Sequence, residues 1–130
     1  MSMSRLLPVV LLVSLLALAG SALALEKPTV NAPSAGDTLG PNYDISGSMP
    51  YKAVLVVITD CVRTDTNEVV GSVPGIRHWT NANGSFAFRC ASPRIFMGDD
   101  VPLVYRVRCY EVSRDQGNGP ETVVECRKAQ

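Results

Sequence analysis

The sequence contains few of the residues from which catalytic sites are usually built. His78 is the only histidine among the 130 residues, so a Ser-His-Asp or Cys-His arrangement would have to use it. It lies between Arg77 and Trp79 in a loop-like stretch, where a solvated histidine is the ordinary state. No G-x-S-x-G segment, which carries the nucleophile of many hydrolases, is present. We therefore predict that the protein is not an enzyme.

Spacings typical of metal sites are also missing. The four cysteines include no C-x-x-C pair, and the chain has no D-x-D-x-D-G loop, so the usual patterns for zinc and calcium are absent. We expect no metal or other cofactor. Several aspartates at strand ends or in loops leave open a calcium site at one end of the domain: Asp60, Asp65, Asp99, Asp100 and Asp115.

After the N-terminus the sequence has no long apolar run. Residues 1–5 form a short basic region, and residues 6–18 are almost wholly apolar. Ala22-Leu23-Ala24 then provides small residues at the positions that signal peptidase recognises. The apolar run is shorter than the roughly 20 residues that a membrane span needs. This pattern predicts a signal peptide over residues 1–24, a single mature domain over 25–130, and a secreted or periplasmic location without a membrane segment.

Charge of one sign is not in excess. The chain has 12 Lys and Arg and 12 Asp and Glu. Removal of Arg5 with the signal peptide leaves 11 basic residues (12 − 1) and a net charge of −1. Nucleic-acid binding needs a strong basic excess, so we expect no nucleic-acid partner.

No helical period occurs after residue 24. Short segments of alternating or β-branched residues, separated by Gly, Pro, Asn and Asp, predict an antiparallel β-sandwich of about seven strands. The segment 53–59 is apolar on both faces, which favours a central position in a sheet. The expected strands cover residues 29–31, 43–49, 53–59, 68–73, 85–90, 103–113 and 122–127.

The last two of these strands form a predicted hairpin with a polar loop at 114–121. If Cys109 faces Cys126, opposed residues have an index sum of 235, and the two cysteines are placed for a disulfide. The alternation puts two rows toward the core: Tyr105, Val107 and Cys109, and Phe86, Phe88 and Cys90. Glu111 shares this inward phase, which we interpret as a position at the open end of the sandwich.

The spacing of short motifs resembles that of bacterial Ig-like domains. In that family a P-x-V opening precedes an I-x-G strand, a valine-rich strand, a G-x-W/F strand and a terminal turn with Gly-Asn. The matching segments are PTV at 28–30, PSAG at 33–36, ISGS at 45–48, the valine-rich 54–58, NGSF at 83–86 and DQGN at 115–118. The resemblance implies an Ig-like fold and a spacer or binding module.

An even number of cysteines in an exported domain predicts two disulfides. In an Ig-like sandwich the strands that end at Cys61 and Cys90 run in the same direction, so the resemblance implies a bond between them. The hairpin register then pairs Cys109 with Cys126.

One predicted binding surface is the outer face of the sheet that an Ig-like fold would build from 53–59, 103–113 and 122–127. Its apolar row lies beside arginines and a tyrosine, residues common at protein interfaces. We expect a partner protein or a second copy of the chain to bind here. Alternatively, the arginine stems cover the valines. The binding residues on this face are Val54, Val56, Arg106, Arg108 and Tyr110.

Trp79 provides an alternative function. With Arg77, His78 and Tyr51 it would form an aromatic platform for sugar stacking, as in carbohydrate-binding modules. Trp79 would otherwise fill the edge of the sandwich, because a small domain uses most of its large apolar side chains for packing. A small secreted hydrolase inhibitor is a further alternative.

Overall fold

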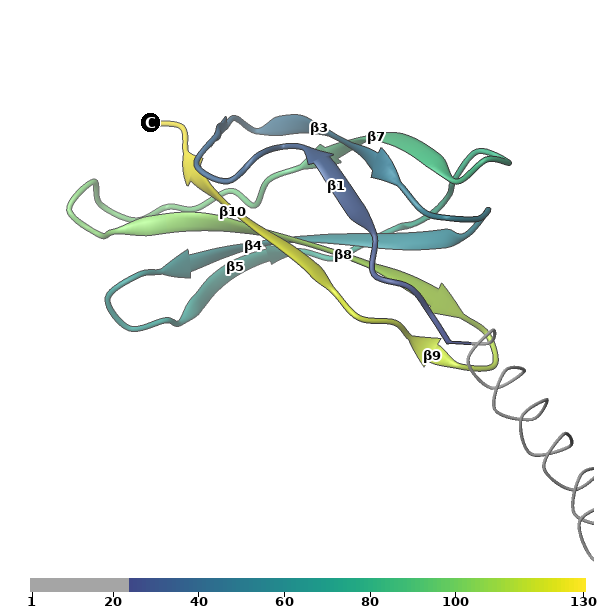
Figure 1. Ribbon diagram of the computed structural model, residues 1–130. Coiled ribbons are helices and arrows are strands. Elements are labelled where there is room, and N and C mark those ends of the chain that lie inside the picture. Colours follow the sequence, from purple (N-terminus) through teal and green to yellow (C-terminus); the bar gives the residue numbers. More distant parts are fainter. Residues whose placement is uncertain (1–23) are drawn as a thin grey trace, which may run out of the picture.

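The computed structural model describes residues 24–130, so all but the last residue of the predicted signal peptide lies outside the described part. The described chain folds into two stacked layers of strands without a helix (Figure 1). The strands are β1 (Thr29–Ala32), β2 (Thr38–Leu39), β3 (Asn42–Ser48), β4 (Val54–Arg63), β5 (Val69–Val73), β6 (Arg77–Trp79), β7 (Ser85–Ala91), β8 (Leu103–Ser113), β9 (Gly117–Asn118) and β10 (Thr122–Lys128).

The smaller layer is a three-stranded sheet in the order β1-β3-β7. The larger is a seven-stranded sheet in the order β2-β10-β8-β4-β5, in which β6 also pairs with β4 and β9 with β8. Figure 1 shows β1, β3 and β7 above the larger sheet, with the N-terminal end of the described chain beside β9 and the C-terminus at the opposite end.

The core lies between the two sheets and follows the predicted alternation. Leu55, Val57 and Cys61 of β4 pack there with Val107 of β8 and Ile45 of β3. The expected inward rows of β7 and β8 are confirmed, with Phe88 and Cys90 only partly buried. The central position of the apolar segment is also confirmed, because β4 pairs with β8 on one side and with β5 and β6 on the other.

Seven of the ten strands coincide with predicted segments, and three short ones were not predicted. Strands β2 and β9 have two residues each and β6 has three. Such lengths are too short for a period to be recognised. Each of these short segments is extended because it hydrogen-bonds to a neighbouring strand, and not because its own sequence favours a strand.

The predicted register of the closing hairpin is wrong. Thr122 pairs with Cys109 and Cys126 with Tyr105, which gives an index sum of 231 instead of 235. The turn lies earlier than expected, because Gly117 and Asn118 form β9 and pair back onto Ser113 and Val112. Gly117 has a φ of +74°, a backbone conformation that glycine adopts at little cost.

The two predicted disulfides are not present in the structure, which contains four free cysteines: Cys61, Cys90, Cys109 and Cys126. The observed register separates Cys109 from Cys126 by four ladder positions, or about 13 Å. A disulfide requires Cα atoms about 4.4–6.8 Å apart. Cys61 and Cys90 lie on β4 and β7 without a bond between them. Beside Cys90, the hydroxyl of its ladder partner Tyr43 bonds across the sheets to Thr59 Oγ1 at 2.5 Å.

Candidate binding surface

The ladder places all six predicted binding residues on the outer face of the seven-stranded sheet. Directly opposed residues of an antiparallel pair share a face. Val54 is opposed to Trp79, and Val56 is opposed to both Arg77 and Tyr110. Arg108 and Arg106 follow further along β8, opposite Ile58 and Asp60. The surface predicted from the valine row and the one predicted from Trp79 are therefore parts of one face.

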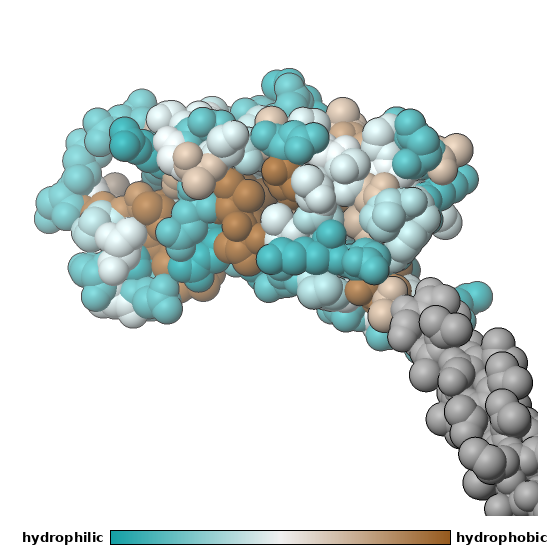
Figure 2. All heavy atoms as spheres, in the orientation of Figure 1, coloured by the Kyte–Doolittle hydropathy of each residue, from teal (hydrophilic) through white to brown (hydrophobic). Residues whose placement is uncertain are grey.

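The middle of this face is covered. Val56 is only 8% exposed. The loop at Gly75 packs against it so closely that a side chain on Gly75 would clash with Val56. Figure 2 views the sandwich from the side of β1 and β10, where apolar groups appear at the surface as patches between hydrophilic residues. The predicted row of valines lies on the outer face, but it does not form a continuous exposed stripe.

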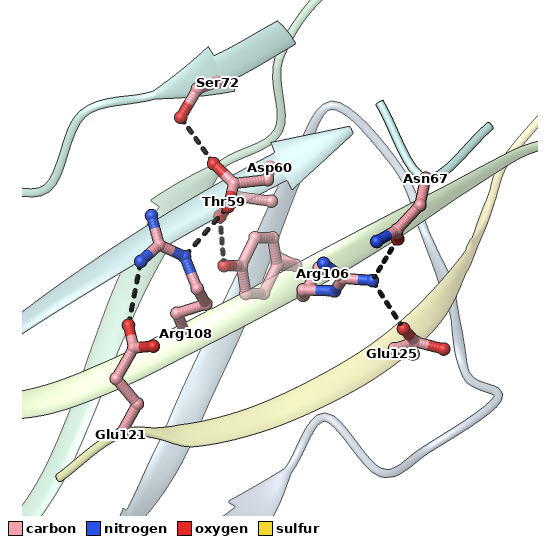
Figure 3. Close-up of polar contacts among 9 residues, drawn as sticks. Thr59, Asp60, Asn67, Ser72, Arg106, Arg108, Glu121 and Glu125 are labelled. Atoms are coloured by element: carbon pink, nitrogen blue, oxygen red, sulfur yellow. Dashed lines mark hydrogen bonds and ion pairs between the residues drawn. The ribbon is translucent and has the colours of Figure 1, made fainter. Parts of the chain in front are cut away.

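Two arginines of β8 form ion pairs across the neighbouring strands (Figure 3). Arg108 Nε lies 2.8 Å from Asp60 Oδ2, and its Nη1 lies 2.8 Å from Glu121 Oε2. The hydroxyl of Ser72 donates to the other oxygen of the buried Asp60 carboxylate at 2.6 Å. Arg108 therefore holds strands together and is poorly placed to meet a partner.

Arg106 makes a second, more exposed set of contacts. Its Nη2 lies 3.0 Å from Glu125 Oε1 and 3.4 Å from Asn67 Oδ1. Exposed pairs of this kind contribute roughly 0–1 kcal/mol to stability. The two arginines therefore crosslink the face instead of leaving free charge around the valines.

The outer face opens at its Trp79 end. Trp79 is 67% exposed, and Lys52 Nζ lies 5.2 Å from the centroid of its ring. Beside it is a cleft of about 770 Å³, lined by the N-terminal segment, the β3–β4 turn, β6 and the β8–β9 turn. The polar and aromatic lining residues are Tyr51, Lys52, Arg77, Trp79, Glu111, Ser113, Arg114 and Gln116.

Glu111 lies at the base of this cleft and is only 6% exposed. Its Oε1 accepts a hydrogen bond from the Tyr51 hydroxyl and lies 3.4 Å from the backbone nitrogen of Glu26. Burial and the bond to Glu111 raise the pKa of Tyr51 to about 12, so this hydroxyl stays protonated and keeps donating. A glutamate can therefore occupy this inward-facing position, because two hydrogen-bond donors at the end of the sandwich contact its carboxylate.

His78 does not belong to the aromatic platform. It is opposed to the buried Leu55, so it lies on the inner face. Its ring stacks on Phe88 of the other sheet at a centroid distance of 4.3 Å. His78 is therefore partly buried and not a freely solvated loop residue, because the unpredicted strand β6 turns its side chain toward the inner face. Tyr51, Arg77 and Trp79 do come together at the cleft.

Sequence reasoning missed the other lining residues. Lys52, Arg114 and Gln116 lie in turns that are far apart in the sequence and carry no motif. The N-terminal segment reaches the cleft from the far end of the sequence, with Leu25 beside Gly119 and the backbone nitrogen of Glu26 beside Tyr51 and Glu111. No local pattern could have predicted this meeting of four segments.

The remaining chemistry of the described chain is limited. Residues 24–130 contain no group of three or more His, Cys, Asp or Glu side chains placed to hold a metal ion. Within the same range, no helix is long and apolar enough to cross a membrane. Burial raises the pKa of Cys109 to about 12 and that of Cys126 to about 11, which lowers the reactivity of both thiols.

Comparison with known proteins found no matching family model, no similar curated protein and no similar solved structure.

Proposed function

We propose that the protein is an exported, non-catalytic binding module of the Ig-like type. Export rests on the signal-peptide pattern of residues 1–24. The Ig-like assignment is supported by the strand order. In chain order β1, β3 and β7 correspond to strands A, B and E of one sheet, and β4, β8 and β10 to C, F and G of the other.

The partner-binding surface is the Trp79 end of the outer face. The observation that carries this proposal is the 67% exposed Trp79 beside the large cleft. Tryptophan is enriched among the residues that dominate binding energies. Three cations line the same cleft: Lys52, Arg77 and Arg114. Among the cleft-lining residues of the described range 24–130, the only carboxylate is that of the buried Glu111.

This composition favours a protein partner that presents carboxylates around an apolar or aromatic side chain. Complementary charge speeds association and excludes wrong partners. A second copy of the chain docked cleft to cleft would bring like charges together. We therefore favour a different protein over self-association through this surface.

A carbohydrate ligand is the second candidate. It is favoured by the concave shape of the site, with an exposed indole ring beside hydrogen-bonding groups such as Gln116 and Ser113. Lys52 already lies over the Trp79 ring, so a stacked sugar would have to displace it or use the other side of the ring.

The experiment compares two aromatic truncations. Trp79→Ala removes the proposed anchor, whereas Phe96→Ala removes a 94% exposed aromatic side chain in a loop outside the cleft. Exported proteins captured by the wild type are identified, and the affinity of each purified partner is then measured. A glycan array is probed in parallel with the same three proteins.

We expect Trp79→Ala to weaken binding of the authentic partner at least tenfold, and Phe96→Ala to leave it unchanged. Loss of a glycan signal in Trp79→Ala alone would favour the carbohydrate ligand. If Trp79→Ala keeps every partner and every glycan of the wild type, the proposed surface is wrong.

A further inference from the structure

Among the described residues 24–130, no strand pairs with the outer edge of β7 in the smaller sheet. Strand β7 is the last strand in the order β1-β3-β7. Backbone groups of a strand point alternately to its two sides. Gly84 accepts a bond from Met49 N, toward β3, whereas both backbone groups of Ser85 bond away from β3, to Asn83 and Asn81. The alternation then directs the N–H and C=O groups of Ala87, Arg89 and Ala91 to the open edge.

A cavity lies between this edge and the other sheet. Its volume is about 200 Å³, which is enough for one large apolar side chain. Arg89, Cys90 and Ala91 of β7 form one wall. The opposite side is lined mainly by apolar groups of the larger sheet and its loop: Val57, Val73, Pro74 and Ile76. Ile76 is 72% exposed, so an apolar residue stands at the mouth of the cavity.

The cavity matches the position that an added strand would present to the interior. Side chains opposite Phe88 or Cys90 would point between the sheets, because opposed residues share a face. The ring of His78 already stacks on Phe88. The place beside Cys90 is bordered by the cavity, so an apolar residue opposite Cys90 would enter it.

The positive charge of Arg89 on this edge determines which kind of added strand would pair favourably with β7. Arg89 is at the centre of the open groups, and its side chain is largely exposed. Its nearest carboxylate, Asp44, is 3.8 Å away and equally exposed. Two copies of the chain paired antiparallel about Arg89 would place the two arginines opposite each other, which is destabilising. An acidic residue opposite Arg89 is favourable.

We propose that β7 is a docking edge for an extended segment of another protein. The segment adds a strand beside Ala87–Ala91, places an acidic residue opposite Arg89, and inserts the adjacent apolar residue into the cavity beside Cys90. Main-chain hydrogen bonds supply affinity in this mode of recognition, and alternate side chains supply specificity. This edge belongs to the smaller sheet and does not overlap with the Trp79 cleft.

The test is a selection of peptides from a random displayed library on the full exported chain. Enriched peptides are synthesised with the acidic residue as Glu or as Lys, and their affinities are measured by calorimetry. Ala87→Pro removes an open-edge N–H, a change that edge strands tolerate. Arg89→Glu reverses the central charge, and Arg94→Glu is the matched control at an exposed arginine outside the edge. Circular dichroism checks that each variant is folded.

We expect enriched peptides to carry an acidic residue next to an apolar one. Ala87→Pro should abolish their binding, and Arg94→Glu should not change it. Arg89→Glu should weaken the Glu peptide about fivefold or more and strengthen the Lys peptide. The proposal is wrong if no peptide is enriched, or if the enriched peptides bind Ala87→Pro and Arg89→Glu as well as the wild type. Peptides lost with Trp79→Ala instead would belong to the cleft and would also overturn the proposal.

Discussion

At the scale of single residues, the buried thiols have the clearest chemical consequence. Cys109 is fully buried at the centre of the larger sheet, paired on one side with Val57 and on the other with Thr122. Because a thiolate there would lack solvation, desolvation raises the pKa of Cys109 from 9.0 to about 12. Between pH 9 and about 12, the folded state therefore keeps a proton on Cys109 that the unfolded chain releases.

This difference predicts a loss of stability in alkali. Between pH 9 and about 12 the unfolded chain binds fewer protons than the folded one, so the free energy of unfolding falls as the pH rises. The contribution of the neutral thiol is fully present below pH 9. We expect Cys109→Ala to show a shallower fall than the wild type when urea unfolding is measured between pH 8 and 11 at fixed ionic strength. Equal slopes would contradict the assignment.

The same burial predicts the outcome of alkylation. In the native protein at neutral pH, iodoacetamide should modify almost none of Cys61, Cys109 and Cys126, because these three thiols are protonated and buried. In denaturant without a reductant, mass spectrometry should find all four modified. Fewer than four would show that the exported protein contains a disulfide that the observed fold does not have.

At the scale of elements, β4 lies at the centre of the larger sheet. It pairs with β8 along nine positions and with β5 and β6 on its other edge. Leu55 on this strand is 0% exposed. Its truncation removes apolar contacts with both sheets and leaves a cavity.

We therefore expect Leu55→Ala to lower the free energy of unfolding by about 2–5 kcal/mol. Val69→Ala, at a half-exposed site on β5, should change it by less than about 0.5 kcal/mol. Chemical denaturation of both variants measures the difference. Similar losses in the two would mean that β4 is not the central element of the core.

The N-terminal segment is a second element with a testable role. The backbone nitrogen of Glu26 lies 3.4 Å from the buried Glu111 carboxylate. Cleavage after Ala24 would create an ammonium group on Leu25, only three covalent bonds, or at most about 3.6 Å, from that nitrogen. The new positive charge should stabilise the carboxylate.

This predicts that Glu111→Gln lowers the free energy of unfolding more in the chain that begins at Leu25 than in a chain extended by a few N-terminal residues. The expected excess is about 1 kcal/mol in the free energy of unfolding, and a double-mutant cycle measures it. An excess indistinguishable from zero would mean that the ammonium does not interact with Glu111.

At the scale of the whole molecule, we expect an exported protein without its first 24 residues. Intact-mass measurement of the exported form should give a chain of 106 residues (130 − 24) that begins at Leu25. The small-residue pattern at Ala22 and Ala24 is the reason for this cleavage point. A mass that retains residues 1–24, or recovery only with membranes, would contradict the prediction.

The sequence by itself determined the class of the fold and the phase of its long strands. The alternation of apolar and polar residues around Phe86 and Val107 indicates which face of each strand is buried, because one face packs in the core and the other faces solvent. It also placed Val54, Trp79 and Tyr110 among the surface candidates.

Only the tertiary structure decided how these strands meet. A two-residue pairing at β9 moved the turn of the last hairpin and separated Cys109 from Cys126. Strand β6 turned His78 inward and left Trp79 outside. The loop at Gly75 covered Val56. Each of these outcomes depends on contacts between segments that are distant in the sequence. The alternation of residues along one strand does not predict such contacts, because the neighbouring segment sets the register of a strand and decides which of its side chains are covered.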